Sequence, residues 1–478
     1  MDMPLLSVNA VRRCGAVLAG AFLMTWPTLY NRYPLLYPDS MSYLEDGRLV
    51  ARAVFLHKFS SDYGGRSFIY CLGILPFHWN VNPWPIVGLN AVLTAYVLWL
   101  VVRSLFPQQT VTHYLALILP LSMFTGLGWF VGWIMPDILG PVLYLSMYLV
   151  VFARESLSRT ERLTLLLIAW WAVASHVTHL MLAASLCLLL VPVLVLQSQP
   201  TRRWLRAVGG VAMIVLVVAA SHLALHLYLY GEPSLNGKRP PFLMARVIAD
   251  GPGRWYLQRH CGDLHLAICD HLHDLPNNVG KFLWGIDGIW DSSSADEQER
   301  LRRDEMPVVL GTLRAYPQEE LIISADHFWR QLQTFGLSDY DPNPSIFEMI
   351  DIALPGARAP YLQSRQAQET LHEEFFTSVQ EWTVMASLVV IAVWTLFVRQ
   401  WSRRVVGLTA IIVFVVIANA AVTGILSNVE DRYQARVIWL VPLLAGVLVL
   451  EWLDHYPRQD CKGEPRLQES ACTNLSDV

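Results

Sequence analysis

The chain has 478 residues, of which 54% are hydrophobic and 15% charged, and this composition excludes an ordinary soluble protein. A net charge of −4 argues against an extended surface for nucleic acid, so no nucleic-acid partner is expected. We therefore expect an all-α polytopic membrane protein with about ten transmembrane helices and a mostly helical extracytoplasmic domain.

Long apolar runs locate the expected spans, because a helix needs about 17 to 25 residues to cross a bilayer. The stretch 163–197 accommodates two short spans only if the chain turns near residues 175–179. The expected spans are residues 14–30, 86–106, 111–132, 136–153, two within 163–197, 207–230, 382–398, 405–426 and 437–453.

These spans divide the chain into four regions. Residues 1–230 form an N-terminal transmembrane module, and its long first outer loop, 31–85, has the polarity of helices lying flat on the membrane. Residues 231–376 are too long for a passive connection and are expected to form an extracytoplasmic domain, with helices over 296–316 and 318–335. Residues 377–453 add the C-terminal transmembrane helices, and the polar residues 454–478 predict a disordered cytoplasmic tail.

Short arginine clusters predict the orientation, because positive residues favour the cytoplasmic side. Both termini are then cytoplasmic, and the loop 31–85, the large domain and the loop 427–436 face outward. The clusters are Arg12 and Arg13; Arg103; Arg154, Arg159 and Arg162; Arg202, Arg203 and Arg206; and Arg399, Arg403 and Arg404.

Two of the seven cysteines, Cys261 and Cys269, lie close together in the outward-facing domain. An oxidising compartment there favours a disulfide between them. Cys14, Cys71 and Cys187 are expected to stay unpaired.

Asp39 lies in an acidic and aromatic stretch, residues 37–47, where the chain leaves its first span. Carboxylates are costly in hydrocarbon, so acids at a membrane exit are either solvated or functional. A positioned carboxylate can act as a general base toward a hydroxyl group, which is the role we assign to Asp39. The alternative is that Asp39 only caps a helix starting at Ser40.

Three further groups of polar residues stand at outer ends of spans. Asp137 follows a proline at the start of a span, where it is either a second site acid or simply favoured by the helix dipole. His176 and His179 are spaced to lie on one face of a helix. They either form hydrogen bonds between helices or contact a phosphate. A metal site is not expected, because the sequence places no third ligand near them. His222 and His226 have the same interhelical interpretation.

Arg432, Tyr433 and Arg436 stand between the last two spans. Guanidinium groups present planar donors that suit a phosphate at headgroup depth, and the alternative is snorkelling at a helix start. Neither a nucleotide-binding glycine loop nor a GxSxG or HExxH motif is present in the sequence.

Three short motifs resemble the C-type membrane glycosyltransferase superfamily, whose members use polyprenyl-phosphate-linked sugars. They are Pro38-Asp39-Ser40 with Tyr43, Met135-Pro136-Asp137-Ile138, and Asp431-Arg432-Tyr433 followed by Pro442. The large domain matches no part of this pattern.

The resemblance implies an inverting sugar transfer from a polyprenyl phosphate to an envelope glycan, lipid or protein acceptor at the outer face of a bacterial inner membrane. Asp39 would be the base and Asp137 would orient the acceptor or the base, whereas Arg432 and Arg436 would stabilise the departing phosphate. Tyr43, Arg66, His176, His179 and Tyr433 would contact substrate. Neither a cofactor nor a metal is expected.

Two other functions remain open from the sequence. A polymerase or ligase of lipid-linked oligosaccharides would place its catalytic residues in the large domain, where the candidates are Arg246, Arg254, Arg259 and His260. A non-enzymatic transporter or assembly protein would have ionisable residues in the middle of its spans, and the sequence has few.

Overall fold

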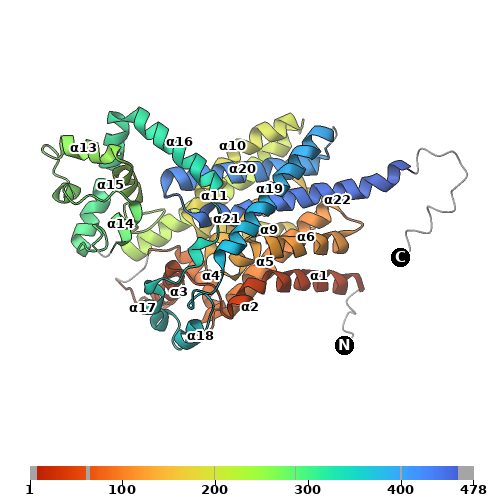
Figure 1. The fold of residues 1–478 in the computed structure, drawn as a ribbon, viewed down its shortest axis with the longest axis horizontal. Coiled ribbons are helices and arrows are strands. Elements are labelled where there is room, and N and C mark those ends of the chain that lie inside the picture. Colours follow the sequence, from red (N-terminus) through yellow and green to blue (C-terminus); the bar gives the residue numbers. More distant parts are fainter. Residues whose placement is uncertain (1–7, 61–64, 199, 286, 399–400, 461–478) are drawn as a thin grey trace, which may run out of the picture.

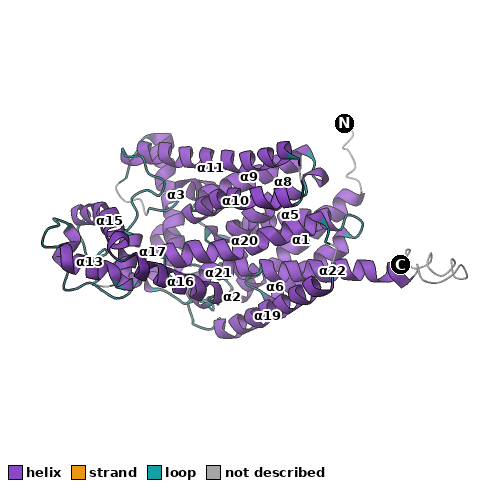
Figure 2. Ribbon diagram, turned by 90° about the horizontal axis from the view of Figure 1, so that it is seen from above, coloured by secondary structure: helices purple, strands orange, loops and turns teal. Residues whose placement is uncertain are grey.

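The computed structural model describes residues 8–60, 65–198, 200–285, 287–398 and 401–460. Over these residues the chain is helical and contains no β-strand; Leu35 and Trp133 form an isolated bridge. The protein is thus an all-α membrane protein, as the composition predicts. Its long helices run side by side along the longest axis of the molecule (Figures 1 and 2).

The described residues of the N-terminal module form eleven α-helices and two short 3-10 turns. They are α1 (Val8–Met24), α2 (Trp26–Asn31), α3 (Pro38–Leu56), α4 (Phe68–His78), α5 (Trp84–Leu105), α6 (Thr110–Phe124), α7 (Leu127–Gly132), η1 (Pro136–Ile138), α8 (Leu139–Phe152), η2 (Arg154–Ser156), α9 (Arg159–Ser175), α10 (Val177–Leu196) and α11 (Thr201–Tyr230).

The large insert and the C-terminal region follow. The insert contains α12 (Phe242–Asp250), α13 (Pro252–His260), η3 (Ala267–His271), α14 (Val279–Trp284), α15 (Ala295–Ala315), α16 (Pro317–Gln333), η4 (Ser338–Tyr340), α17 (Pro344–Ala353) and α18 (Arg358–Leu362). The C-terminal helices are α19 (Glu373–Phe397), α20 (Arg403–Leu426), α21 (Asp431–Ile438) and α22 (Leu440–Asp460). Helices α15 and α16 confirm the two predicted in the insert.

Six helical segments of the described chain are long and apolar enough to cross a membrane, so the predicted count of about ten is not confirmed. Four predicted spans account for the difference. Residues 14–30 are divided between α1 and α2, and 111–132 between α6 and α7, while α8 and α9 have only 14 and 17 residues. The six are Trp84–Leu105, Val177–Leu196, Leu205–Tyr230, Glu373–Phe397, Arg403–Leu426 and Asp431–Asp454.

The predicted tail also needs a correction. Helix α22 continues through the polar residues to Asp460, so the tail does not begin as irregular chain at Asp454. Residues 461–478, to which the rest of that prediction applies, lie outside the described part.

Arginines from several clusters meet at one end of the bundle. Arg103, at the end of α5, binds both carboxylate oxygens of Glu161 at 2.6 and 2.9 Å, and Arg404 donates to the Ser104 carbonyl. Helix α1 begins and α22 ends toward this end, and α13, α14 and α15 lie at the other (Figure 1). The positive clusters and the insert therefore mark opposite ends of the molecule.

The insert is divided between two hydrophobic cores. Residues from α12 to α15 form a separate core that includes Met244, Phe282 and Leu301. Residues after α16, among them Leu337 and Tyr340, belong instead to the core of the transmembrane bundle. Part of the insert is thus built into the bundle.

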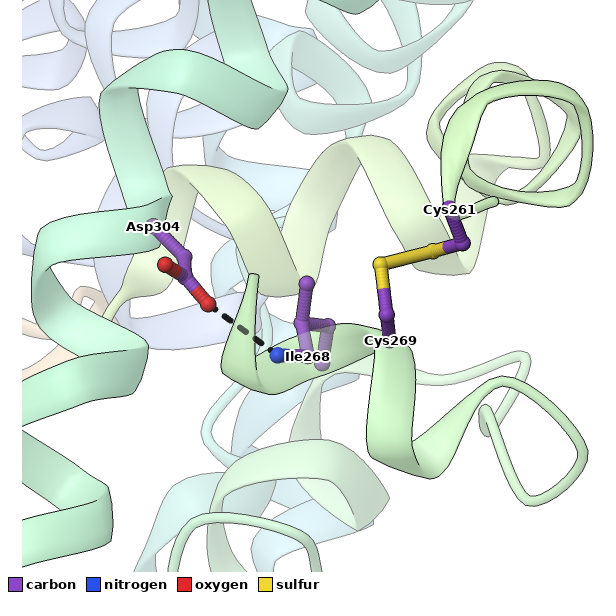
Figure 3. Close-up of a disulfide and its surroundings, with 4 residues drawn as sticks. All are labelled: Cys261, Ile268, Cys269 and Asp304. Atoms are coloured by element: carbon purple, nitrogen blue, oxygen red, sulfur yellow. Dashed lines mark hydrogen bonds between the residues drawn. A yellow bond between two sulfur atoms is a disulfide. The ribbon is translucent and has the colours of Figure 1, made fainter. Parts of the chain in front are cut away.

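A disulfide joins Cys261, at the end of α13, to Cys269 in η3 (Figure 3). Asp304 of α15 accepts a hydrogen bond from the Ile268 backbone at 3.0 Å and fixes the same turn. Cross-linking a short loop lowers the entropy of the unfolded chain and stabilises by about 2 to 3 kcal/mol. Cys14, Cys71 and Cys187 are free.

Helix α12 is tied to the end of α20 by a buried arginine. Arg246 donates to the carbonyls of Gly424 and Ser427 at 2.8 and 2.5 Å and pairs with Asp250 at 2.6 Å. Glu320 of α16 is also buried here, and its Oε1 has no hydrogen-bond partner among the described residues. The junction therefore contains a carboxyl group that is costly to ionise.

The Glu320→Gln variant is expected to unfold with a weaker dependence on pH than the wild type. Burial, with a smaller contribution from Asp250, raises the pKa of Glu320 from 4.5 to about 7. Between pH 4.5 and about 7 the folded protein keeps the Glu320 proton that the unfolded chain has lost. The free energy of unfolding is therefore highest below pH 4.5 and falls as the pH rises to about 7. Above pH 7.5 Glu320→Gln should therefore be more stable than the wild type by about 1 to 2 kcal/mol.

Thermal unfolding of the purified protein across pH 4 to 8 measures this effect, with exposed Glu319→Gln as the matched control. Parallel pH profiles for wild type and Glu320→Gln would contradict the prediction.

Candidate functional site

Asp39 stands in the first turn of α3 and forms an ion pair with Arg66 from the start of the α4 region. The cap of the helix is made by other residues, because the Tyr37 backbone donates to Ser40 Oγ at 2.9 Å. The alternative in which Asp39 caps a helix beginning at Ser40 is therefore wrong. The Asp39 side chain remains 18% exposed, so a substrate can still reach it.

Tyr43 and Arg66 form one wall of the site. The Arg66 guanidinium lies 6.0 Å from the centre of the Tyr43 ring. Burial acts to lower the pKa of Arg66, but the charges of Asp39 and Tyr43 outweigh it and raise that pKa overall. Arg66 is therefore a permanent cation beside the carboxylate.

Arg432, from the other end of the sequence, reaches the same place. Its guanidinium lies 4.4 Å from the Tyr37 ring and 4.9 Å from the Tyr433 ring. Its charge is within electrostatic range of Asp39, and its Nε has no hydrogen-bond partner in the described chain. Cation–π contacts hold the group in place, and its one side-chain hydrogen bond among the described residues runs from Nη2 to the Tyr433 hydroxyl at 3.3 Å, so other donors remain for an anion.

Asp339, in η4 of the insert, is a site residue that sequence analysis missed. Its Oδ2 accepts a hydrogen bond from the Arg432 backbone at 2.8 Å. Burial raises the pKa of Asp339, although the charge of Arg432 opposes this effect. No local pattern distinguishes this acid from the many others in the insert, so only the fold identifies it.

Asp137 and Arg436 form a buried ion pair at 3.2 Å, with side chains 7% and 2% exposed. Asn419 of α20 accepts two further hydrogen bonds from Arg436, at 3.2 and 2.8 Å. Sequence analysis missed Asn419. All three guanidinium nitrogens of Arg436 thus have protein partners, and Arg432 is the more available of the two predicted phosphate ligands.

The predicted turn near residues 175–179 is confirmed, because α9 ends at Ser175 and α10 begins at Val177. His179 hydrogen-bonds through Nδ1 to the Ala172 carbonyl at 2.9 Å, and its Nε2 faces Gly140, where an added Cβ would lie 3.0 Å away. It therefore packs between helices and does not open to the site.

His176, unlike His179, lines the polar cavity of the site. Its Nδ1 accepts from the Thr178 backbone at 3.2 Å, so the ring proton of the neutral form is on Nε2. The charges of Arg66, Arg432 and Arg436 all act on this ring. His176 thus offers a hydrogen-bond donor in a positive environment.

A cavity of about 50 Å³ adjoins Arg66 and His176. Two of its walls are His222 and His226 of α11, which donate to the carbonyls of Ala174 at 3.1 Å and Ser234 at 2.6 Å. The His222 bond joins α11 to α9, as expected for an interhelical role, whereas the His226 bond joins α11 to the loop that follows it. The cavity extends the polar site toward the start of the insert.

The described residues contain no group of three or more His, Cys, Asp or Glu side chains placed to bind a metal ion. No protein-family model, curated protein or solved structure matches this chain. The resemblance to the C-type glycosyltransferases therefore rests on the three short motifs and on the chemistry of the site.

The residues expected for a polymerase or ligase have contacts within or beside the insert. Arg246 is buried in its ion pair, Arg259 lies 5.5 Å from the Tyr316 ring, and His260 packs on Tyr256. Arg246, Arg259 and His260 thus each have a partner within the insert.

Proposed function

We propose that this protein is a membrane glycosyltransferase that moves a sugar from a polyprenyl-phosphate donor to an acceptor hydroxyl at the membrane surface. The observation that supports this most is that the Arg432 guanidinium, which lies over the Tyr37 ring, is within electrostatic range of Asp39. A base and an anion-binding cation in one partly buried site suit the transfer of a group away from a phosphate.

In this reaction the acceptor hydroxyl loses its proton to Asp39 while its oxygen bonds to the anomeric carbon of the sugar. The bond from that carbon to the phosphate oxygen breaks, and its electron pair leaves with the lipid phosphate. Arg432 and the Nε2–H of His176 stabilise the charge that develops on this leaving group. A single displacement of this kind inverts the anomeric centre.

The site then faces the outer side of a bacterial inner membrane, with both termini in the cytoplasm. The arginines at the opposite end support this orientation through the positive-inside rule. A count of about ten crossings requires that α1, α6, α8 and α9 also span the membrane.

Membranes from cells that make the protein are expected to move label from a radiolabelled polyprenyl-phosphate hexose into a glycan, lipid or protein fraction. Membranes lacking the protein are the control. Label that stays on the polyprenyl lipid would contradict the proposal. Consumption of diphosphate-linked oligosaccharides alone would favour the polymerase or ligase.

A further inference from the structure

A second cavity, of about 280 Å³, lies where α8 and α10 end and α20 begins. Helix α10 starts beside the candidate site at Val177 and ends at Leu196, so its 20 residues separate the two places by about 30 Å. The cavity is therefore distant from the catalytic residues proposed above, and it lies at the arginine-rich end of the bundle.

The lining of this cavity is apolar inside and polar at its rim. Val151 and Leu194 are buried, and Phe152 completes the apolar wall. Arg403 and Arg404 contribute guanidinium groups from the first turn of α20. An apolar wall beside cationic groups matches the chemistry of a phospholipid, whose phosphate adjoins its acyl chains.

Gln197 lines the same cavity, and its Nε2 is buried without a hydrogen-bond partner among the described residues. A buried donor without an acceptor is costly and calls for a group that the protein itself does not provide. A phosphate oxygen in the cavity would accept this hydrogen bond.

The placement of the two arginines also needs an explanation. The start of a helix is the positive end of its dipole, where cations are unfavourable and anions favourable. Ser402 already caps α20 by accepting from the Val405 backbone at 3.2 Å. A bound anion between Arg403 and Arg404 would turn this unfavourable arrangement into a favourable one.

Among the described residues that line the cavity, Arg403 and Arg404 are basic and Glu155 is acidic. This described lining has a net positive charge, so it favours a ligand with net negative charge.

We propose that this cavity binds the headgroup of an anionic phospholipid, with the phosphate held by Arg403, Arg404 and Gln197 and an acyl chain against Phe152. Free inorganic phosphate presents the same anion to these residues, and the experiment below distinguishes it from a phospholipid headgroup. The proposal does not depend on the glycosyltransferase activity.

The test measures binding of phosphatidylglycerol to the purified full-length protein in detergent by native mass spectrometry, with phosphatidylcholine and inorganic phosphate as the other ligands. Phosphatidylglycerol is expected to bind at least about tenfold more tightly than phosphatidylcholine. Arg403→Gln with Arg404→Gln should remove that preference, and exposed Arg159→Gln should leave it unchanged.

Arg404 also holds the Ser104 carbonyl, so its replacement can disturb folding. Gln197→Leu is the second variant, and it should weaken phosphatidylglycerol binding several-fold with an unchanged melting temperature. Equal binding of both lipids, or unchanged phosphatidylglycerol binding in both variants, would overturn the proposal. Inorganic phosphate that competes fully with the lipid would overturn the lipid assignment.

Discussion

Asp39→Asn is expected to lower the rate of sugar transfer about 100-fold or more, because a positioned base commonly contributes a factor of 10² to 10⁴. Asparagine keeps the shape of the side chain and can still accept a hydrogen bond from Arg66. It cannot take a proton from the acceptor. Transfer of label from the polyprenyl-phosphate hexose, normalised to the amount of folded protein, measures the effect.

The control for this prediction is Glu45→Gln on the same helix. Glu45 makes a longer ion pair with Arg48, at 3.6 Å, and its loss should leave transfer unchanged. A second explanation for a loss of transfer is that Asp39→Asn leaves the Arg66 cation without its counter-charge.

The double variant Asp39→Asn with Arg66→Gln separates the two explanations. If Asp39 is only the counter-charge of Arg66, removing both charges should restore much of the activity. If Asp39 is the base, the double variant stays inactive. Wild-type transfer by Asp39→Asn itself would rule out the proposed role.

Asp137→Asn is expected to destabilise the fold by about 3 to 5 kcal/mol, because it leaves a buried guanidinium without its counter-charge. Arg436 is 2% exposed, and Asn419 can provide only a neutral acceptor. The midpoint of thermal unfolding of the purified protein at neutral pH measures the loss.

Asp326→Asn is the matched control, since its pair with Arg330 is 3.7 Å long and both side chains are about 60% exposed. That surface pair should contribute no more than about 1 kcal/mol. Asp137→Asn with Arg436→Gln should recover part of the stability by removing the unpaired charge. A single Asp137→Asn variant as stable as the Asp326→Asn control would show that the buried pair is not needed for the fold.

Asp339 gives the insert a connection to the site. Because it binds the backbone of Arg432, the segment after α16 helps to fix the start of α21. Gln331 reinforces this by accepting from the Glu430 backbone at 3.0 Å and donating to its carbonyl at 2.8 Å. The proposed phosphate-binding arginine is thus positioned by residues that no motif connects to it.

Features that depend on local composition can be predicted from the amino-acid sequence. Long apolar runs need helices to satisfy their backbone in a bilayer, so the all-α membrane class follows directly. The break at His176 and helices α15 and α16 also follow from local pattern, because polar interruptions and apolar spacing act within a few residues.

Which groups meet depends on how the helices pack. Arg66 pairs with Asp39, Asp339 binds the Arg432 backbone and Asn419 binds Arg436, and in each case the two partners come from different elements of the fold. Which of two similar arginines keeps its donors available depends on what packs against each one. Neighbours in sequence do not encode that choice, because side-chain partners across a helical bundle are set by how the helices pack and not by the periodicity of any one of them.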